Sequence, residues 1–224
     1  HLDYPPVPLH RFLEDTAAKY PNHTATIFGS GGHPVGGNRI DAKLTYQQLD
    51  EQVNRLANAL MTMGVKQGDR VAIFLPNCPQ FIITYYAILK IGAIVSPNNP
   101  LYVARELEHQ LNDSGSETIV CLGRFYPIVQ RIRAHTKLRN VIVANLGEYF
   151  APIRESGFGA GPEKEAGECV TLEPGDQWFP EVLAGAPATK PKVSVRPQDT
   201  GVLMYTGGTT GVSKAAELTH NNLV

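Results

Sequence analysis

Glycines, threonines and one lysine are concentrated in a short segment near the end of the sequence, YTGGTTGVSK. Its three glycines let the backbone turn sharply and bring N–H groups close to an anion. Its three threonine hydroxyls add hydrogen-bond donors, and the lysine adds a compact positive charge. We therefore expect a loop that binds the phosphates of a nucleotide. The residues assigned to it are Thr206, Gly207, Gly208, Thr209, Thr210, Gly211 and Lys214.

Lys214 is also the candidate catalytic residue, because its charge would stabilise the negative charge that accumulates on phosphate oxygens during displacement at phosphorus. A Walker A loop is the obvious rival. It requires Gly-Lys followed by Ser or Thr and then a helix. Here the order is Ser213-Lys214-Ala215, and a strand is expected at 215–218. The sequence therefore disfavours an ATPase or GTPase of the P-loop class.

Three other polar residues have a structural interpretation that we prefer to a chemical one. His220 follows Thr219, and this order favours a helix that begins with Thr219 as its N-cap. Asn98 and Asn99 lie between two prolines, which favours a turn that caps the next helix over a ligand contact.

Composition excludes several classes of function. The formal net charge of −1 gives the chain as a whole no attraction to nucleic acid or to an anionic membrane. Cys78, Cys121 and Cys169 are odd in number and widely spaced, which argues against a disulfide framework or a zinc site and favours a reducing cytoplasm. No metal-ligand set and no secretory signal are recognisable. One basic cluster is interpreted as a solvated helix face: Arg131, Arg133, Lys137 and Arg139.

Hydrophobic periodicity predicts helices that alternate with short apolar strands. We expect helices at 8–20, 45–63, 79–91, 103–112 and 126–135, and strands at 25–28, 40–44, 70–75, 93–95, 117–121, 141–144, 202–205 and 215–218. This alternation predicts an α/β fold with a doubly wound, mostly parallel sheet and helices on both faces. Ligands of such sheets bind beyond the carboxyl ends of the strands. From 145 to 197 the pattern is irregular, with Trp178-Phe179 as its expected anchor to the core.

The segment YTGGTTGVSKAAELTHNNLV resembles the signature loop of the adenylate-forming superfamily, which includes acyl-CoA synthetases, luciferases and peptide-synthetase adenylation domains. Its Thr-Gly-Gly start is most similar to bacterial medium- and long-chain fatty-acid:CoA ligases. The resemblance extends to LTYQQLDEQVNRLANAL, GDRVAIFLPNCPQFIITYYAILKIGAIVSPNNPLY and RELEHQLNDSG. Two positions depart from the usual pattern, since Ser213 replaces a frequent proline and Ala215 a frequent glycine.

The resemblance implies that residues 1–224 form part of the large N-terminal domain, with a sheet region at 1–144, an excursion at 145–197 and the loop region at 198–224. It implies that the C-terminal domain is absent and that the chain alone is inactive. The implied reaction activates a fatty acid with ATP to an acyl-adenylate and then to acyl-CoA. ATP, Mg²⁺ and coenzyme A are the implied cofactors and co-substrates, and the magnesium and coenzyme A sites are expected outside this chain.

The partners implied are these small molecules and not nucleic acid. Peripheral membrane contact and a homodimer of the full enzyme stay open. So do two alternative functions, an adenylate-forming enzyme for another carboxylate and a non-catalytic module for nucleotide binding or oligomerisation.

Overall fold

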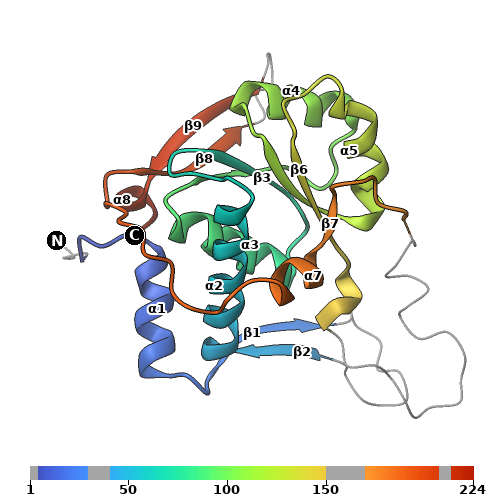
Figure 1. Ribbon diagram of the computed structural model, residues 1–224. Coiled ribbons are helices and arrows are strands. Elements are labelled where there is room, and N and C mark those ends of the chain that lie inside the picture. Colours follow the sequence, from blue (N-terminus) through green and yellow to red (C-terminus); the bar gives the residue numbers. More distant parts are fainter. Residues whose placement is uncertain (1–4, 30–40, 150–169, 207–212) are drawn as a thin grey trace, which may run out of the picture.

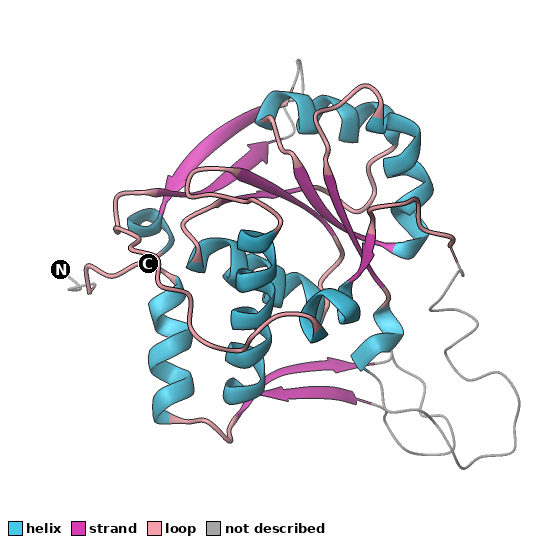
Figure 2. Ribbon diagram, in the orientation of Figure 1, coloured by secondary structure: helices cyan, strands magenta, loops and turns pink. Residues whose placement is uncertain are grey.

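A seven-stranded sheet forms the centre of the molecule in the computed structural model, which describes residues 5–29, 41–149, 170–206 and 213–224. The order across the sheet is β7-β6-β5-β3-β4-β8-β9. Figures 1 and 2 show helices on both sides of this sheet. The strands are β3 (Arg70–Phe74), β4 (Ile94–Pro97), β5 (Thr118–Leu122), β6 (Asn140–Ala144), β7 (Gln177–Trp178), β8 (Thr200–Thr206) and β9 (Lys214–Thr219).

All neighbouring strands of this sheet are parallel except β8 and β9, which pair antiparallel. From β3 the chain crosses to β4 on one side, and it then returns to β5 on the other side of β3 and continues to β6. This reversal is the mark of a doubly wound sheet. The fold class expected from the sequence is therefore confirmed.

The two faces of the sheet carry two hydrophobic clusters, because alternate side chains of each strand point to opposite faces. In β3, Val71 and Ile73 belong to one cluster, whereas Ala72 and Phe74 belong to the other. Helices α2 (Tyr46–Thr62), α3 (Pro79–Lys90) and α7 (Phe179–Ala184) cover the first face, and α1 (His10–Lys19) packs on α2 and α3. Helices α4 (Ala104–Ser114) and α5 (Tyr126–Arg133) cover the second.

Local sequence signals account for the helix ends. Thr45 caps α2, since its hydroxyl accepts from the Gln48 amide and the Gln48 side chain accepts from the Thr45 amide. Pro79 occupies the first turn of α3, where no amide donor is needed. Gly115 ends α4 at a φ of 65°, in the left-handed region that favours glycine.

A separate two-stranded sheet lies below the helices of the first face in Figure 1. It consists of β1 (Thr24–Gly29) and β2 (Asp41–Thr45), which pair antiparallel as expected. Short helices complete the described chain: η1 (Gly123–Phe125), η2 (Leu146–Tyr149) and α8 (His220–Leu223).

The described part of 145–197 is more ordered than the sequence suggested. It contains η2, the strand β7 and the helix α7, and β7 extends the sheet by pairing with β6. Phe179 is fully buried in the first hydrophobic cluster, as expected of an anchor to the core. These elements were not predicted, because they are too short to show a hydrophobic periodicity.

Among the described residues, no helix has the length and apolarity that crossing a bilayer would demand. Cys78 and Cys121 are buried free thiols, and Cys169 lies outside the described residues. Burial raises the pKa of the Cys78 thiol to about 11, so this thiol is a poor nucleophile at neutral pH.

One residue of the basic cluster departs from the expected solvated face. The Arg133 guanidinium donates to both Asp176 carboxylate oxygens, at 2.8 and 2.9 Å, and so ties α5 to the segment that leads into β7. Arg139 keeps an exposed ion pair with Glu117.

Candidate functional site

The candidate phosphate-binding loop connects β8 to β9. Because β8 runs parallel to β4, its last residues lie at the carboxyl edge of the parallel sheet, where ligands of doubly wound folds bind. Thr206 ends β8, Lys214 begins β9, and the two face each other as a register pair. The Thr206 hydroxyl donates to the Lys214 carbonyl at 3.5 Å, and the Ser213 hydroxyl donates to the Thr206 carbonyl at 2.8 Å. These bonds close the base of the loop.

The structure thus brings together the first and last residues assigned to the loop. The five residues between them lie outside the described part of the chain: Gly207, Gly208, Thr209, Thr210 and Gly211. Thr206 and Lys214 are both exposed. Among the described residues, no carboxylate forms an ion pair with the Lys214 ammonium.

Tyr205 links this hairpin to α4. Its phenol donates to Asp113 Oδ2 at 2.7 Å, across 92 positions of sequence. Burial raises the pKa of Tyr205, and the hydrogen bond to the Asp113 carboxylate raises it further, so the phenol stays a neutral donor. Sequence reasoning missed this pair. The only signal was indirect, since both residues lie in segments that carry the family resemblance.

The far end of the hairpin is held by α8. Thr219 caps this helix with a hydroxyl that accepts from the Asn222 amide at 3.3 Å, as the sequence predicted. His220 is fully buried, and its Nδ1 accepts from the Leu9 amide at 3.2 Å. Burial lowers the pKa of His220, which keeps the imidazole neutral and able to accept this bond. The predicted helix start with Thr219 as its N-cap is confirmed.

Asn98 and Asn99 form a turn after β4, but they do not cap the next helix. The Asn99 carboxamide oxygen accepts from the Leu101 amide at 3.0 Å, and the buried Asn98 donates to the Ser96 carbonyl at 2.9 Å. The expected cap is wrong, because α4 begins at Ala104 with Val103 as its N-cap, and the Val103 amide donates to a carboxylate oxygen of Glu106 inside the helix. A glutamate on the first turn supplies the acceptor that the asparagines were expected to supply.

A second polar cluster lies at the carboxyl ends of β3 and β6. The buried Gln80 amide donates to the Asn145 carbonyl at 2.7 Å and to Glu148 at 2.8 Å. Glu148 also accepts from the Asn145 amide at 2.7 Å, and it lines a cavity of about 330 Å³ with Arg55. Burial raises the pKa of Glu148 to about 7, although both hydrogen bonds oppose the rise.

The described residues contain no group of three or more His, Cys, Asp or Glu side chains that could hold a metal ion. What the described part of the hairpin offers is a cation, hydroxyls and a strand end at the ligand edge of the sheet.

Comparison with known proteins identifies the family. Residues 13–224 match the model of the AMP-binding enzyme family. The long-chain-fatty-acid–CoA ligase of Bacillus subtilis is 32% identical over all of this chain, which covers 38% of that protein. The crotonobetaine/carnitine–CoA ligase of Shigella flexneri is 30% identical over 96% of this chain, which covers 37% of it.

A crystal structure of a long-chain-fatty-acid–CoA ligase from Archaeoglobus fulgidus has the same fold, with a TM-score of 0.76 and 28% identity. The match covers 99% of this chain and 38% of that structure. The chain thus spans between a third and two fifths of the length of the relatives it matches. With a family model that matches nearly its whole length and a fold shared with a solved member, this chain belongs to the AMP-binding enzyme family.

Proposed function

We propose that this chain forms the phosphate-binding part of an AMP-forming acid–thiol ligase that activates a fatty acid. The observation that carries the proposal is the β8–β9 hairpin, which places Thr206 and Lys214 side by side at the ligand edge of the sheet. The family match and the fatty-acid ligases among the relatives support the choice of reaction and of substrate class.

In the proposed reaction, a carboxylate oxygen attacks the α-phosphorus of ATP. The bond from this phosphorus to the oxygen that bridges to the β-phosphate breaks, and pyrophosphate leaves. The thiol of coenzyme A then attacks the acyl carbonyl, loses its proton and displaces AMP. In the first step Lys214 and the loop hydroxyls would hold the β- and γ-phosphates and stabilise the charge that grows on pyrophosphate. No residue of the chain is assigned as a nucleophile.

Phosphate binding in the first step is the one role proposed for this chain. The acyl pocket, the magnesium ligands and the thiol step are assigned to none of its residues, since the chain spans only 33–38% of its curated relatives. Because one relative is a crotonobetaine/carnitine–CoA ligase, a carboxylate other than a fatty acid is the alternative substrate.

ATP–pyrophosphate exchange in the natural polypeptide that contains this chain tests the proposal. We expect exchange that depends on a medium- or long-chain fatty acid. Lys214→Ala should slow it about 100-fold or more, because one preorganised electrostatic donor has that effect. Lys192→Ala is the matched control, since Lys192 is exposed and lies outside the hairpin. Exchange driven only by crotonobetaine or a similar acid would support the alternative, and ATP binding without exchange would indicate a non-catalytic module.

A further inference from the structure

The tie between Tyr205 and α4 suggests a role for a residue outside the glycine-rich segment. We propose that Asp113 is a positioning residue for the end of the β8–β9 hairpin that carries Thr206 and Lys214, and that it acts through the phenol of Tyr205. This inference rests on the proposed function, because it concerns how these two residues are presented to ATP. It adds to that function a residue on a helix that the loop sequence does not include.

The loop end of the hairpin has little other support from the sheet. β8 and β4 are in register at one pair, Val202 with Val95, four residues before the end of β8. From Leu203 to Thr206, β8 is paired in the described structure only with β9, which is the edge strand. A two-stranded hairpin is marginally stable by itself and gains stability from packing against other elements. Tyr205 is one residue from the loop and provides such a contact.

The helix end that carries Asp113 is itself firmly held. The Arg70 guanidinium of β3 donates to the Ser114 carbonyl at 2.7 Å and to the Gly115 carbonyl at 3.1 Å. Leu111, on the same turn, is buried in the second hydrophobic cluster. The end of α4 is thus hydrogen-bonded to a central strand. Through the bond between Asp113 and Tyr205, the hairpin is attached to this fixed helix end. Figure 1 shows α4 beside the loop end of β8 and β9.

The charge of Asp113 argues for a role in orientation and against direct contact with phosphate. A carboxylate repels a polyphosphate, whereas a phenol that donates to the carboxylate screens part of its charge and fixes the direction of the bond. Burial raises the pKa of Tyr205 and this contact raises it further, so the phenol stays neutral. Asp113 therefore acts on the tyrosine and not on the nucleotide.

The test measures ATP–pyrophosphate exchange in the natural polypeptide, with kcat and KM determined separately for ATP and for the acid. Asp113→Ala and Tyr205→Phe each remove the bond, and each should lower kcat/KM for ATP about threefold to tenfold, as loss of one hydrogen bond does. KM for the acid should not change. Asp113→Asn keeps an acceptor oxygen and should stay within about twofold of the parent. The double variant should be no worse than either single variant, because both remove the same bond.

Glu108→Ala is the control on the same helix, since Glu108 faces His135 and makes no contact with the hairpin in the described structure. Melting temperatures of all variants separate loss of stability from loss of positioning. A merely structural bond would lower the melting temperature and leave kcat/KM for ATP unchanged, and this result would overturn the inference.

Lys214→Ala, measured in the same series with equilibrium binding of Mg-ATP, separates the two proposals. If Lys214→Ala weakens exchange and Asp113→Ala does not, the inference fails and the proposed function stands. If the parent neither binds Mg-ATP nor catalyses exchange, both fail.

Discussion

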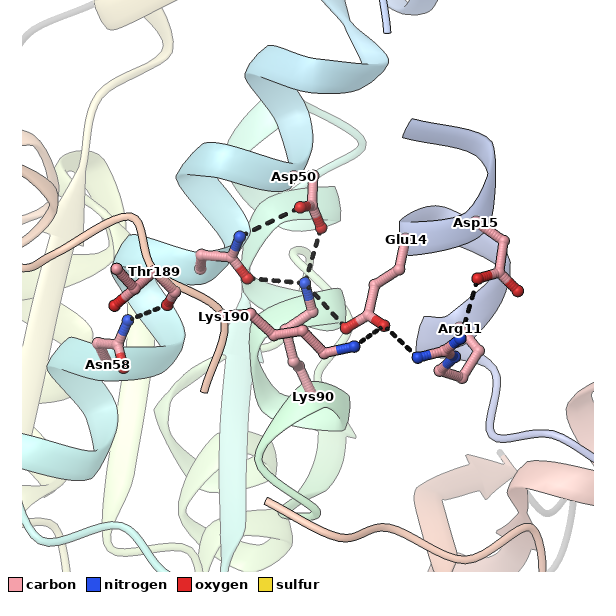
Figure 3. A network of polar contacts seen from close by, with 9 residues as sticks. Arg11, Glu14, Asp15, Asp50, Asn58, Lys90, Thr189 and Lys190 are labelled. Carbon is pink, nitrogen blue, oxygen red and sulfur yellow. Dashed lines mark hydrogen bonds and ion pairs between the residues drawn. The ribbon is translucent and has the colours of Figure 1, made fainter. Parts of the chain in front are cut away.

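Lys90 Nζ lies 2.7 Å from Asp50 Oδ1, although the Lys90 side chain is only 1% exposed (Figure 3). The same ammonium donates to the Asn54 carboxamide oxygen at 2.7 Å and lies 3.3 Å from Glu14. These partners come from α1 and α2, while Lys90 ends α3. One buried cation therefore joins α1, α2 and α3 on the first face of the sheet.

Lys90→Met keeps most of the side-chain volume but removes the charge. We expect it to lower the free energy of unfolding by about 3–5 kcal/mol, because it leaves the Glu14 and Asp50 carboxylates without their buried partner. Urea denaturation of the wild-type chain and the variant measures the change. In a double-mutant cycle, Asp50→Asn should cost at least 1 kcal/mol less in the Lys90→Met background than alone.

Lys190→Met is the matched control for the buried lysine. Lys190 also pairs with Glu14, but its side chain is 54% exposed, so its loss should cost less than about 1 kcal/mol. Equal losses for the two variants would contradict the idea that burial gives Lys90 its importance.

Lys90 also shows where sequence reasoning reached its limit. It follows an apolar segment, Phe81 to Leu89, inside the helix expected at 79–91. The structure buries it, because its partners lie 36 to 76 positions away on other helices. Periodicity is a local signal and contains no information about such distant pairing.

The same limit applies to the candidate site. The alternation of helices and strands predicted the sheet, and the loop sequence predicted a segment between two strands, in which the structure pairs Thr206 with Lys214. Both are consequences of residues close together in the chain. The contact from Tyr205 to Asp113 depends on how α4 lies across the finished sheet, and no pattern in the sequence sets that distance.

His10 should make the stability of the chain fall in mild acid. Burial lowers the pKa of His10 to about 4 from a usual 6.5, with Glu14 opposing the shift and His220, Lys90 and Lys190 adding to it. Below pH 6.5 His10 binds a proton in the unfolded chain but stays neutral in the folded chain. The free energy of unfolding therefore falls by about 3 kcal/mol by pH 4. Urea denaturation from pH 7.5 to 4.5 should show a smaller loss in His10→Gln than in the parent. Parallel curves would show that His10 titrates normally in the folded chain.

Glu148 should act in the opposite direction over an overlapping range. Burial raises its pKa to about 7; Cys78 and Tyr149 lie near it, and Arg55 lines the same cavity. Between pH 4.5 and 7 the folded chain holds a proton that the unfolded chain has lost, so this contribution to stability declines as pH rises through 7. Glu148→Gln keeps the shape and the hydrogen-bond acceptor but cannot ionise. It should raise stability relative to the parent at pH 8 more than at pH 5.

Glu51→Gln provides the comparison for that measurement, because Glu51 is exposed on α2 and should leave the pH profile unchanged. A Glu148→Gln profile that runs parallel to the parent's would mean that the buried carboxyl is already ionised at pH 5.

Gly115 should tolerate no side chain while Arg70 keeps its place. A Cβ atom at Gly115 would come within 2.9 Å of Arg70 Nη2, and the φ of 65° already disfavours alanine. We expect Gly115→Ala to lower the free energy of unfolding by about 1–2 kcal/mol from backbone strain, with more from displacement of the guanidinium. Replacing Arg70 with Met removes the close contact, so Gly115→Ala should then cost only the backbone term. Urea denaturation of the four proteins gives the coupling, and additive losses would show that Arg70 moves aside without cost.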